Sequence, residues 1–160
     1  MDHVLLSIHV LASIVFVGGS AVAASLFPRY APLAPAAGPP DEPSPSASPP
    51  GERSPAVAAL LHRITGGYAA FGLIVPVAGI ALALVQGRMG EIWINVAMVL
   101  TIVAGGLLAT QIYPRQRAAL STPDDGRRLR TLSMLAGVYN LVWAVVVVLM
   151  IVRPGAVPPA

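Results

Sequence analysis

Cysteine and lysine are both absent from this sequence of 160 residues, and charged residues make up only 11% of it. Without cysteine the chain cannot form disulfides, thiolate metal sites or thiol nucleophiles. The sequence also shows no paired carboxylates for acid–base work, no nucleotide-binding glycine loop and no nucleophile beside a base. No catalytic machinery is evident, and the sequence favours a protein that is not an enzyme.

Hydrophobic residues supply 56% of the chain, which is more than a soluble domain of this size could bury. A bilayer core about 30 Å thick needs roughly 20 apolar residues in each crossing helix. Four stretches meet this length: residues 4–27, 64–85, 92–113 and 132–152. They predict an all-α fold, an integral membrane four-helix bundle in which residues 1–160 form a single membrane domain.

The first stretch has a second interpretation, because the small residues around Ala21 to Ala23 resemble a signal-peptidase site after an apolar segment. However, no lysine or arginine precedes the apolar run, and the run is longer than an ordinary signal core. We therefore expect a retained transmembrane helix.

The arginines are distributed unequally between the two faces that four crossings create. The connections at 28–63 and 114–131 share one face and hold eight arginines, whereas the opposite face has only Arg88 and Arg153. Basic loops stay in the cytoplasm. Both termini are therefore expected outside.

The two arginine-rich connections differ in character. Residues 28–56 hold ten prolines and little to bury, so they predict a disordered cytoplasmic loop that serves as a spacer or, alternatively, as a docking segment for a proline-binding partner. The connection at 114–131 carries five arginines. Anionic lipid at Arg127, Arg128 and Arg130 would explain this cluster, and topology control explains it equally well.

Small residues recur in the apolar stretches, with Gly-Gly pairs at 18–19, 66–67 and 105–106. Such residues let membrane helices approach closely, which favours a compact bundle. Pro76 lies halfway along the second stretch and is expected to kink it.

Three segments of the chain carry a family resemblance. They are the first helix with Ile8 and His9 leading to Gly19, the "LHRITGGY" entry to the second helix, and "GLIVPVAGIALAL" followed by the "EIW" start of the third. The chain resembles the CopD-like bacterial four-helix membrane proteins, and within them the uncharacterised family called domain of unknown function 2269. The resemblance implies a multi-pass protein of the bacterial plasma membrane, with copper uptake or haem synthesis as related activities.

His9 is a titratable ring inside an apolar run, so it is the main candidate for chemistry. With a rise of 1.5 Å per residue, His9 and His62 lie on the order of 20 Å apart along the bundle, so they cannot share one iron. Asn95, Met98 and Met150, with Met89 and Gln86 nearby, lie at the depth of His9. Imidazole with thioether ligands suits Cu(I) or a His/Met haem, so His9 is the candidate metal ligand and His9, Met98 and Met150 form the candidate cofactor set.

Three interpretations of His9 stay open: a hydrogen-bonded contact between helices, a copper or haem b ligand, and a proton carrier. The first is favoured, and no cofactor is predicted. Asn140 is expected to bridge helices, and His62 with Arg63 to anchor the cytoplasmic boundary near Tyr68 and Tyr113. The sequence thus favours an accessory or scaffold-like membrane component, whose partners are the lipid bilayer and a homo-oligomer or larger membrane complex and include no nucleic acid. A copper- or haem-handling protein is the alternative.

Overall fold

The computed structural model of the protein describes residues 2–34, 53–71 and 91–155; of residues 2–10 and 12 it describes the backbone alone. These residues form helices and no strand, which confirms the predicted all-α fold for the described part. The elements are α1 (Asp2–Tyr30), α2 (Pro55–Phe71), α4 (Ile92–Leu107), the π-helical turn η1 (Leu108–Ile112), α5 (Tyr113–Ser121) and α6 (Arg127–Val152). α4, η1 and α5 are continuous and make one helix from residue 92 to residue 121.

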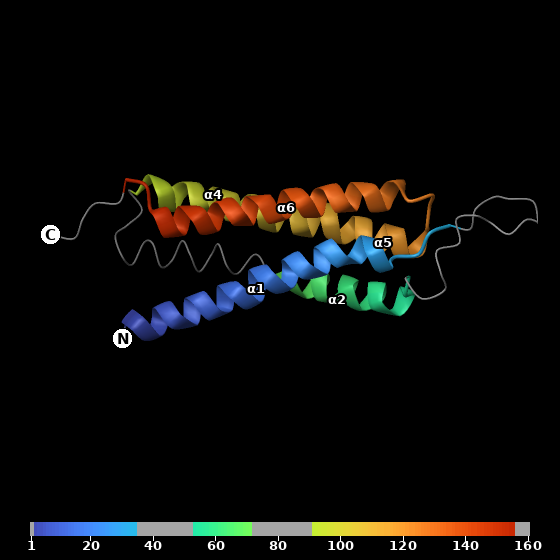
Figure 1. The fold of residues 1–160 in the computed structure, drawn as a ribbon, viewed down its shortest axis with the longest axis horizontal. Coiled ribbons are helices and arrows are strands. Elements are labelled where there is room, and N and C mark those ends of the chain that lie inside the picture. The colour runs from blue at the N-terminus through green and yellow to red at the C-terminus, as the bar shows by residue number, and fades with distance from the viewer. Residues whose placement is uncertain (1, 35–52, 72–90, 156–160) are drawn as a thin grey trace, which may run out of the picture.

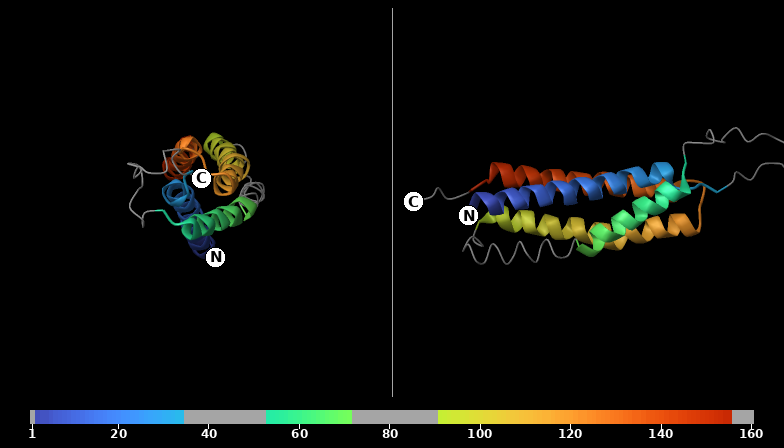
Figure 2. Two further views of the ribbon diagram at one scale, coloured as in Figure 1. Left: turned by 90° about the vertical axis from the view of Figure 1, so that its right-hand side faces the viewer. Right: turned by 90° about the horizontal axis from the view of Figure 1, so that it is seen from below.

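The helices run side by side and are drawn around a common axis (Figure 1 and Figure 2). α1 packs against α2 and α6, α4 packs against α6, and α2 packs against α5. The N-terminal part of α1 diverges from α4 and α6 (Figure 1). The end of α1, the start of α2, α5 and the start of α6 meet at one end of the molecule. We call this the loop end, and it comprises residues 27–34, 53–63 and 113–132.

Within the described residues, two helices, 92–121 and 127–152, are long and apolar enough to cross a membrane. In their most apolar segments only 17% and 22% of the residues are buried, so most of the apolar surface faces outward. The outward side chains include Ile92, Val99, Ile102 and Val103 of α4, and Met134, Val138, Leu141, Val148 and Ile151 of α6. The predicted second crossing lies outside the described residues beyond Phe71, and so do Pro76, Gln86 and Met89.

The interior of the described bundle combines small residues with a few large side chains. The small residues come from every long helix and allow close packing: Ala23, Ala24, Ala58, Ala104 and Ala136. The large side chains Phe27, Leu108, Ile112, Leu132 and Tyr139 fill the space between them. Alanine and glycine thus let the helices approach, while aromatic and branched residues fix their register.

The segment 28–56, predicted as a disordered loop, is helical at both of its ends. α1 continues to Tyr30 because Arg53 donates hydrogen bonds to the backbone oxygens of Ala31 at 2.7 Å and Pro28 at 3.4 Å, carbonyls that would otherwise lack partners at a helix end. α2 begins at Pro55, whose fixed backbone angle suits a first helical position, after Ser54. The central residues, 35–52, lie outside the described part.

The prediction of a loop from 114 to 131 is wrong in its bounds, because the chain is helical to Ser121 and again from Arg127. Pro114 cannot donate a backbone hydrogen bond and would break a regular helix. Instead, the π-helical turn η1 precedes it, with the Tyr113 amide bonded to the Leu108 oxygen, and the helix then resumes. The arginines of this region are therefore held on helices.

Candidate functional site

The centre of the bundle contains a buried hydroxyl pair. Ser20 Oγ of α1 and the Tyr139 hydroxyl of α6 are 2.7 Å apart. Ser20 donates to the Val17 oxygen at 3.1 Å, so the Tyr139 hydroxyl is the donor in the pair. Both side chains are almost fully buried, at 0% and 1% exposed. This hydrogen bond joins the first and last helices where little water can compete.

Aromatic rings continue this contact across the bundle. The Trp143 ring meets the Tyr139 and Phe16 rings edge-on, each with centroids 6.4 Å apart. Phe16 in turn meets Tyr68 of α2 at 5.3 Å and 88°, and the Tyr68 hydroxyl donates to the Val15 oxygen at 3.2 Å. The chain of rings joins α1, α2 and α6. Tyr68, predicted near the same boundary as His62, thus packs against α1.

Asn140 bridges two helices, as predicted from its position in an apolar stretch. Its Nδ2 donates to Ser25 Oγ of α1 at 2.9 Å. The amide oxygen is buried and has no hydrogen-bond partner in the described part of the chain, and the same is true of Trp143 Nε1. The middle of α6 therefore has unused hydrogen-bonding capacity on two neighbouring turns.

A second polar cluster lies at the loop end between α2 and α5. The His62 ring stacks on the Tyr113 ring, with centroids 4.6 Å apart and planes 10° apart. His62 Nδ1 is 3.3 Å from Gln116 Oε1, and because an amide oxygen accepts, Nδ1 carries the hydrogen. A Cβ added at Gly66 would lie 2.7 Å from the Tyr113 ring. Gly66 is thus required for the stack.

Gln116 was not predicted as a site residue, although it is fully buried and its Nε2 has no partner among the described residues. Helical spacing offered a signal, because Gln116 recurs with the apolar residues 108, 112 and 119 at intervals of three or four. All four residues are buried in the structure. Gln116 is the polar member of this apolar series, and it forms the hydrogen bond with His62, the predicted boundary anchor.

The predicted layer around His9 is described only in part. His9 belongs to α1, but its side chain lies outside the description. Met98 is half-buried on α4, Asn95 is exposed on α4, and Met150 of α6 is 39% exposed. The contacts Ser20–Tyr139 and Phe16–Trp143 set an antiparallel register in which position 9 lies at the level of position 150 along the helix axes. No group of three or more potential metal-binding residues occurs among the described side chains.

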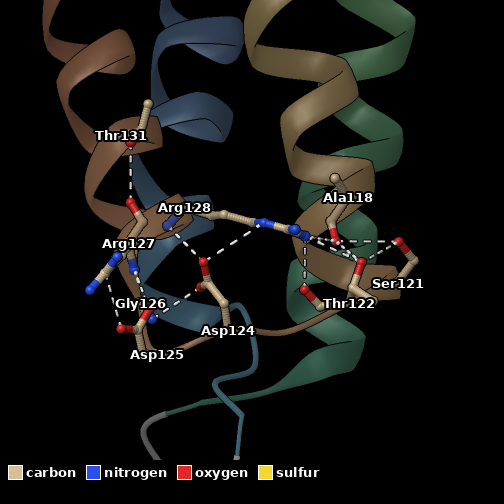
Figure 3. Close-up of polar contacts among 9 residues, drawn as sticks. All are labelled: Ala118, Ser121, Thr122, Asp124, Asp125, Gly126, Arg127, Arg128 and Thr131. Atoms are coloured by element: carbon tan, nitrogen blue, oxygen red, sulfur yellow. Dashed lines mark hydrogen bonds and ion pairs between the residues drawn. The ribbon is translucent and has the colours of Figure 1, made fainter.

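The turn before α6 is organised by Asp124 (Figure 3). Its carboxylate accepts from the backbone amides of Gly126 at 3.0 Å and Arg128 at 3.1 Å, and it pairs with the Arg128 guanidinium at 3.7 Å. Arg128 also donates to the Thr122 oxygen at 3.0 Å. Arg127 pairs with Asp125.

Comparison with protein-family models, with curated proteins and with solved structures returns no match. The resemblance to CopD-like proteins and to the domain of unknown function 2269 family therefore stays a prediction. Function must be argued from the chain itself, and the lipid prediction for Arg127, Arg128 and Arg130 now has a structural context. Arg127 and Arg128 are already paired with aspartates, whereas Arg130 is exposed on the first turn of α6.

Proposed function

We propose that the protein is a multi-pass protein of the bacterial plasma membrane, with four crossings and both termini extracytoplasmic, that acts as a non-catalytic accessory or scaffold-like component of a membrane complex. The observation that carries this proposal is the distribution of apolar side chains in α4 and α6. Many large apolar residues face outward, while the interior combines small residues and a few large side chains with hydrogen-bonded hydroxyls. That distribution suits lipid as the surrounding solvent.

Polar groups at the centre of the bundle support a scaffold role, because they fix one arrangement of helices. The Ser20–Tyr139 and Asn140–Ser25 bonds join α1 to α6, and the small residues between them allow close contact. A rigid bundle with ordered arginine-bearing helices at its loop end gives a membrane partner a constant surface. The partner is a second copy of the chain or another membrane protein.

The experiment is mild solubilisation from the membranes of a cell that makes the protein, followed by chemical crosslinking and mass measurement. A scaffold component is expected in a particle that holds at least two protein chains, since one chain accounts for 16.5 kDa. Recovery solely as a single chain, at every detergent concentration and crosslinker length tried, would contradict the scaffold role.

A copper- or haem-handling role is the second candidate, and one observation favours it. The α1–α6 register brings position 9 of the α1 backbone level with Met150 along the helix axes. His9, Met98 and Met150 would then hold Cu(I) or haem b, groups that accept imidazole and thioether ligands.

Metal analysis and a visible spectrum of the purified protein distinguish the two candidates. A ligand role predicts stoichiometric copper or a haem band that disappears in His9→Ala and weakens in Met150→Leu. A helix contact predicts no cofactor signal, and His9→Ala then costs about 1 kcal/mol of stability, the size of one hydrogen bond between membrane helices. His9→Asn should restore much of that loss.

A further inference from the structure

The loop end carries two kinds of arginine. Four are engaged within the protein: Arg53 with the end of α1, Arg115 with Gln111, Arg127 with Asp125 and Arg128 with Asp124. The side chains of the other four are exposed and make no hydrogen bond, ion pair or ring contact in the described part of the chain. These four, which we call the unpaired set, are Arg29, Arg63, Arg117 and Arg130.

Each helix at the loop end contributes one member of the unpaired set. Arg29 lies in the last turn of α1, Arg63 in α2, Arg117 in α5 and Arg130 in the first turn of α6. The view along the bundle shows these helices arranged around one axis (Figure 2). The four arginines therefore come from four different helices around this axis.

Cross-helix contacts show that members of the set share one level. Ser20 of α1 contacts Tyr139 of α6; nine residues after Ser20 is Arg29, and nine before Tyr139 is Arg130. At the far end of the bundle Arg153 lies 5.8 Å from the centre of the Trp93 ring. Arg130 precedes Arg153 by nearly the same number of residues as Arg117 follows Trp93. Arg117 and Arg130 therefore lie at nearly the same level.

Arg63 lies slightly deeper, because its neighbour His62 stacks on Tyr113, which precedes Arg117 by about one helical turn. The apolar stretches end at residues 27, 64, 113 and 132. The four arginines of the unpaired set lie one to four residues outside these ends, or up to about 6 Å along a helix. A bilayer is about 40–45 Å thick with headgroups and about 30 Å without them, so this depth is the headgroup layer.

We propose that the unpaired set binds the phosphates of anionic lipids in the cytoplasmic leaflet. The inference rests on the proposed membrane placement and assigns the lipid contacts to Arg29, Arg63, Arg117 and Arg130. A guanidinium presents a planar fork of donors that matches phosphate oxygens. The described carboxylates at this end, Asp124 and Asp125, are already paired, so they leave the charge of the set available.

The experiment uses the full-length protein in neutral detergent micelles, titrated with phosphatidylglycerol or with phosphatidylcholine while its thermal unfolding midpoint is followed. Phosphatidylglycerol should raise the midpoint at a lower mole fraction than phosphatidylcholine. The variant Arg29→Gln/Arg130→Gln should need about 25-fold more phosphatidylglycerol for the same gain, because each basic residue near an anionic leaflet contributes about fivefold.

The matched control is Arg115→Gln/Arg127→Gln, which removes the same charge from engaged arginines. It should shift the required phosphatidylglycerol by less than about fivefold. Equal shifts for the two variants would overturn the proposal, since they would indicate diffuse attraction. An equal gain from inorganic phosphate without lipid would also overturn it, because the ligand would then be the free ion.

Failure of the lipid inference differs from failure of the proposed function. An integral protein that shows no preference between the two lipids contradicts only the lipid site. A protein released from membranes by alkaline carbonate contradicts the membrane placement as well. If the double variant unfolds, Arg29→Gln and Arg130→Gln are tested singly, and each should weaken the phosphatidylglycerol effect about fivefold; no change in both would overturn the proposal.

Discussion

Gly19 and Gly66 have no room for a side chain, whereas the glycine beside each of them faces open space. A Cβ added at Gly19 would lie 2.1 Å from the Tyr68 hydroxyl oxygen, and nothing lies within 4 Å of one added at Gly18. Gly66 and Gly67 differ in the same way, with Tyr113 as the neighbour of Gly66. In the pairs 18–19 and 66–67 one residue therefore admits a tyrosine ring from another helix.

The Gly-Gly pairs provide a matched stability test. Gly19→Ala should lower the free energy of unfolding by about 1–3 kcal/mol, the usual cost of overpacking, because Tyr68 must leave its contact with Val15. Gly18→Ala should be neutral or stabilising, since alanine is the better helix former by about 1 kcal/mol. Titration with a denaturing detergent measures both. Similar effects at the two positions would rule out the tyrosine contact as the cause.

The buried hydroxyl pair of Ser20 and Tyr139 should be energetically coupled. A double-mutant cycle with Ser20→Ala and Tyr139→Phe is expected to give about 0.6 kcal/mol, the average for hydrogen bonds between membrane helices. The cycle removes each hydroxyl with little change in shape. A coupling energy of zero would mean that the two groups do not stabilise the bundle through each other.

Single residues were only partly predictable from sequence. Asn140 could be assigned an interhelical bond because an amide in an apolar helix needs a partner. Gln116 was missed because it follows Pro114 and Arg115 in a segment that reads as a polar loop. The partners themselves, such as Ser25 for Asn140, depend on the register of distant helices, which one sequence does not specify.

At the scale of helices, apolar length predicted where the elements lie but not where they end. The predicted stretches 92–113 and 132–152 fall within the helices found, which extend to Ser121 and begin at Arg127. An apolar stretch ends where the apolar side chains end, whereas backbone hydrogen bonding continues the helix beyond that point. Capping and turn residues were better signals of where the helices begin. They are Ser54-Pro55 at the start of α2 and Asp124-Asp125-Gly126 before α6.

Asp124 should control the start of α6. Asp124→Ala removes two acceptors for backbone amides and the partner of Arg128, so it should lower the free energy of unfolding by about 1–2 kcal/mol. Asp125→Ala is the control, because its pair with Arg127 is exposed (87% and 66% for the arginine and aspartate side chains) and such pairs contribute little. Equal losses, measured by detergent titration, would contradict a capping role for Asp124.

At the scale of the whole molecule, the eight-to-two distribution of arginines predicts topology. A reporter inserted near Ser46 should read as cytoplasmic and one fused after Pro159 as extracytoplasmic. Phosphatase and fluorescent-protein fusions give complementary signals. The reverse pattern would contradict the orientation. Two reporters on the same side would contradict the three crossings predicted between residue 46 and residue 159.

The absence of cysteine allows the most direct test of lipid as the solvent of this bundle. Single cysteines introduced at outward positions of α6 (Val138, Leu141, Val148) and at the buried Val146 can be spin-labelled in lipid vesicles. The outward labels should be accessible to oxygen and protected from a water-soluble nickel chelate, while the label at 146 should be protected from both. High accessibility of the outward labels to the nickel chelate would show that water covers this face and would contradict a membrane-spanning bundle.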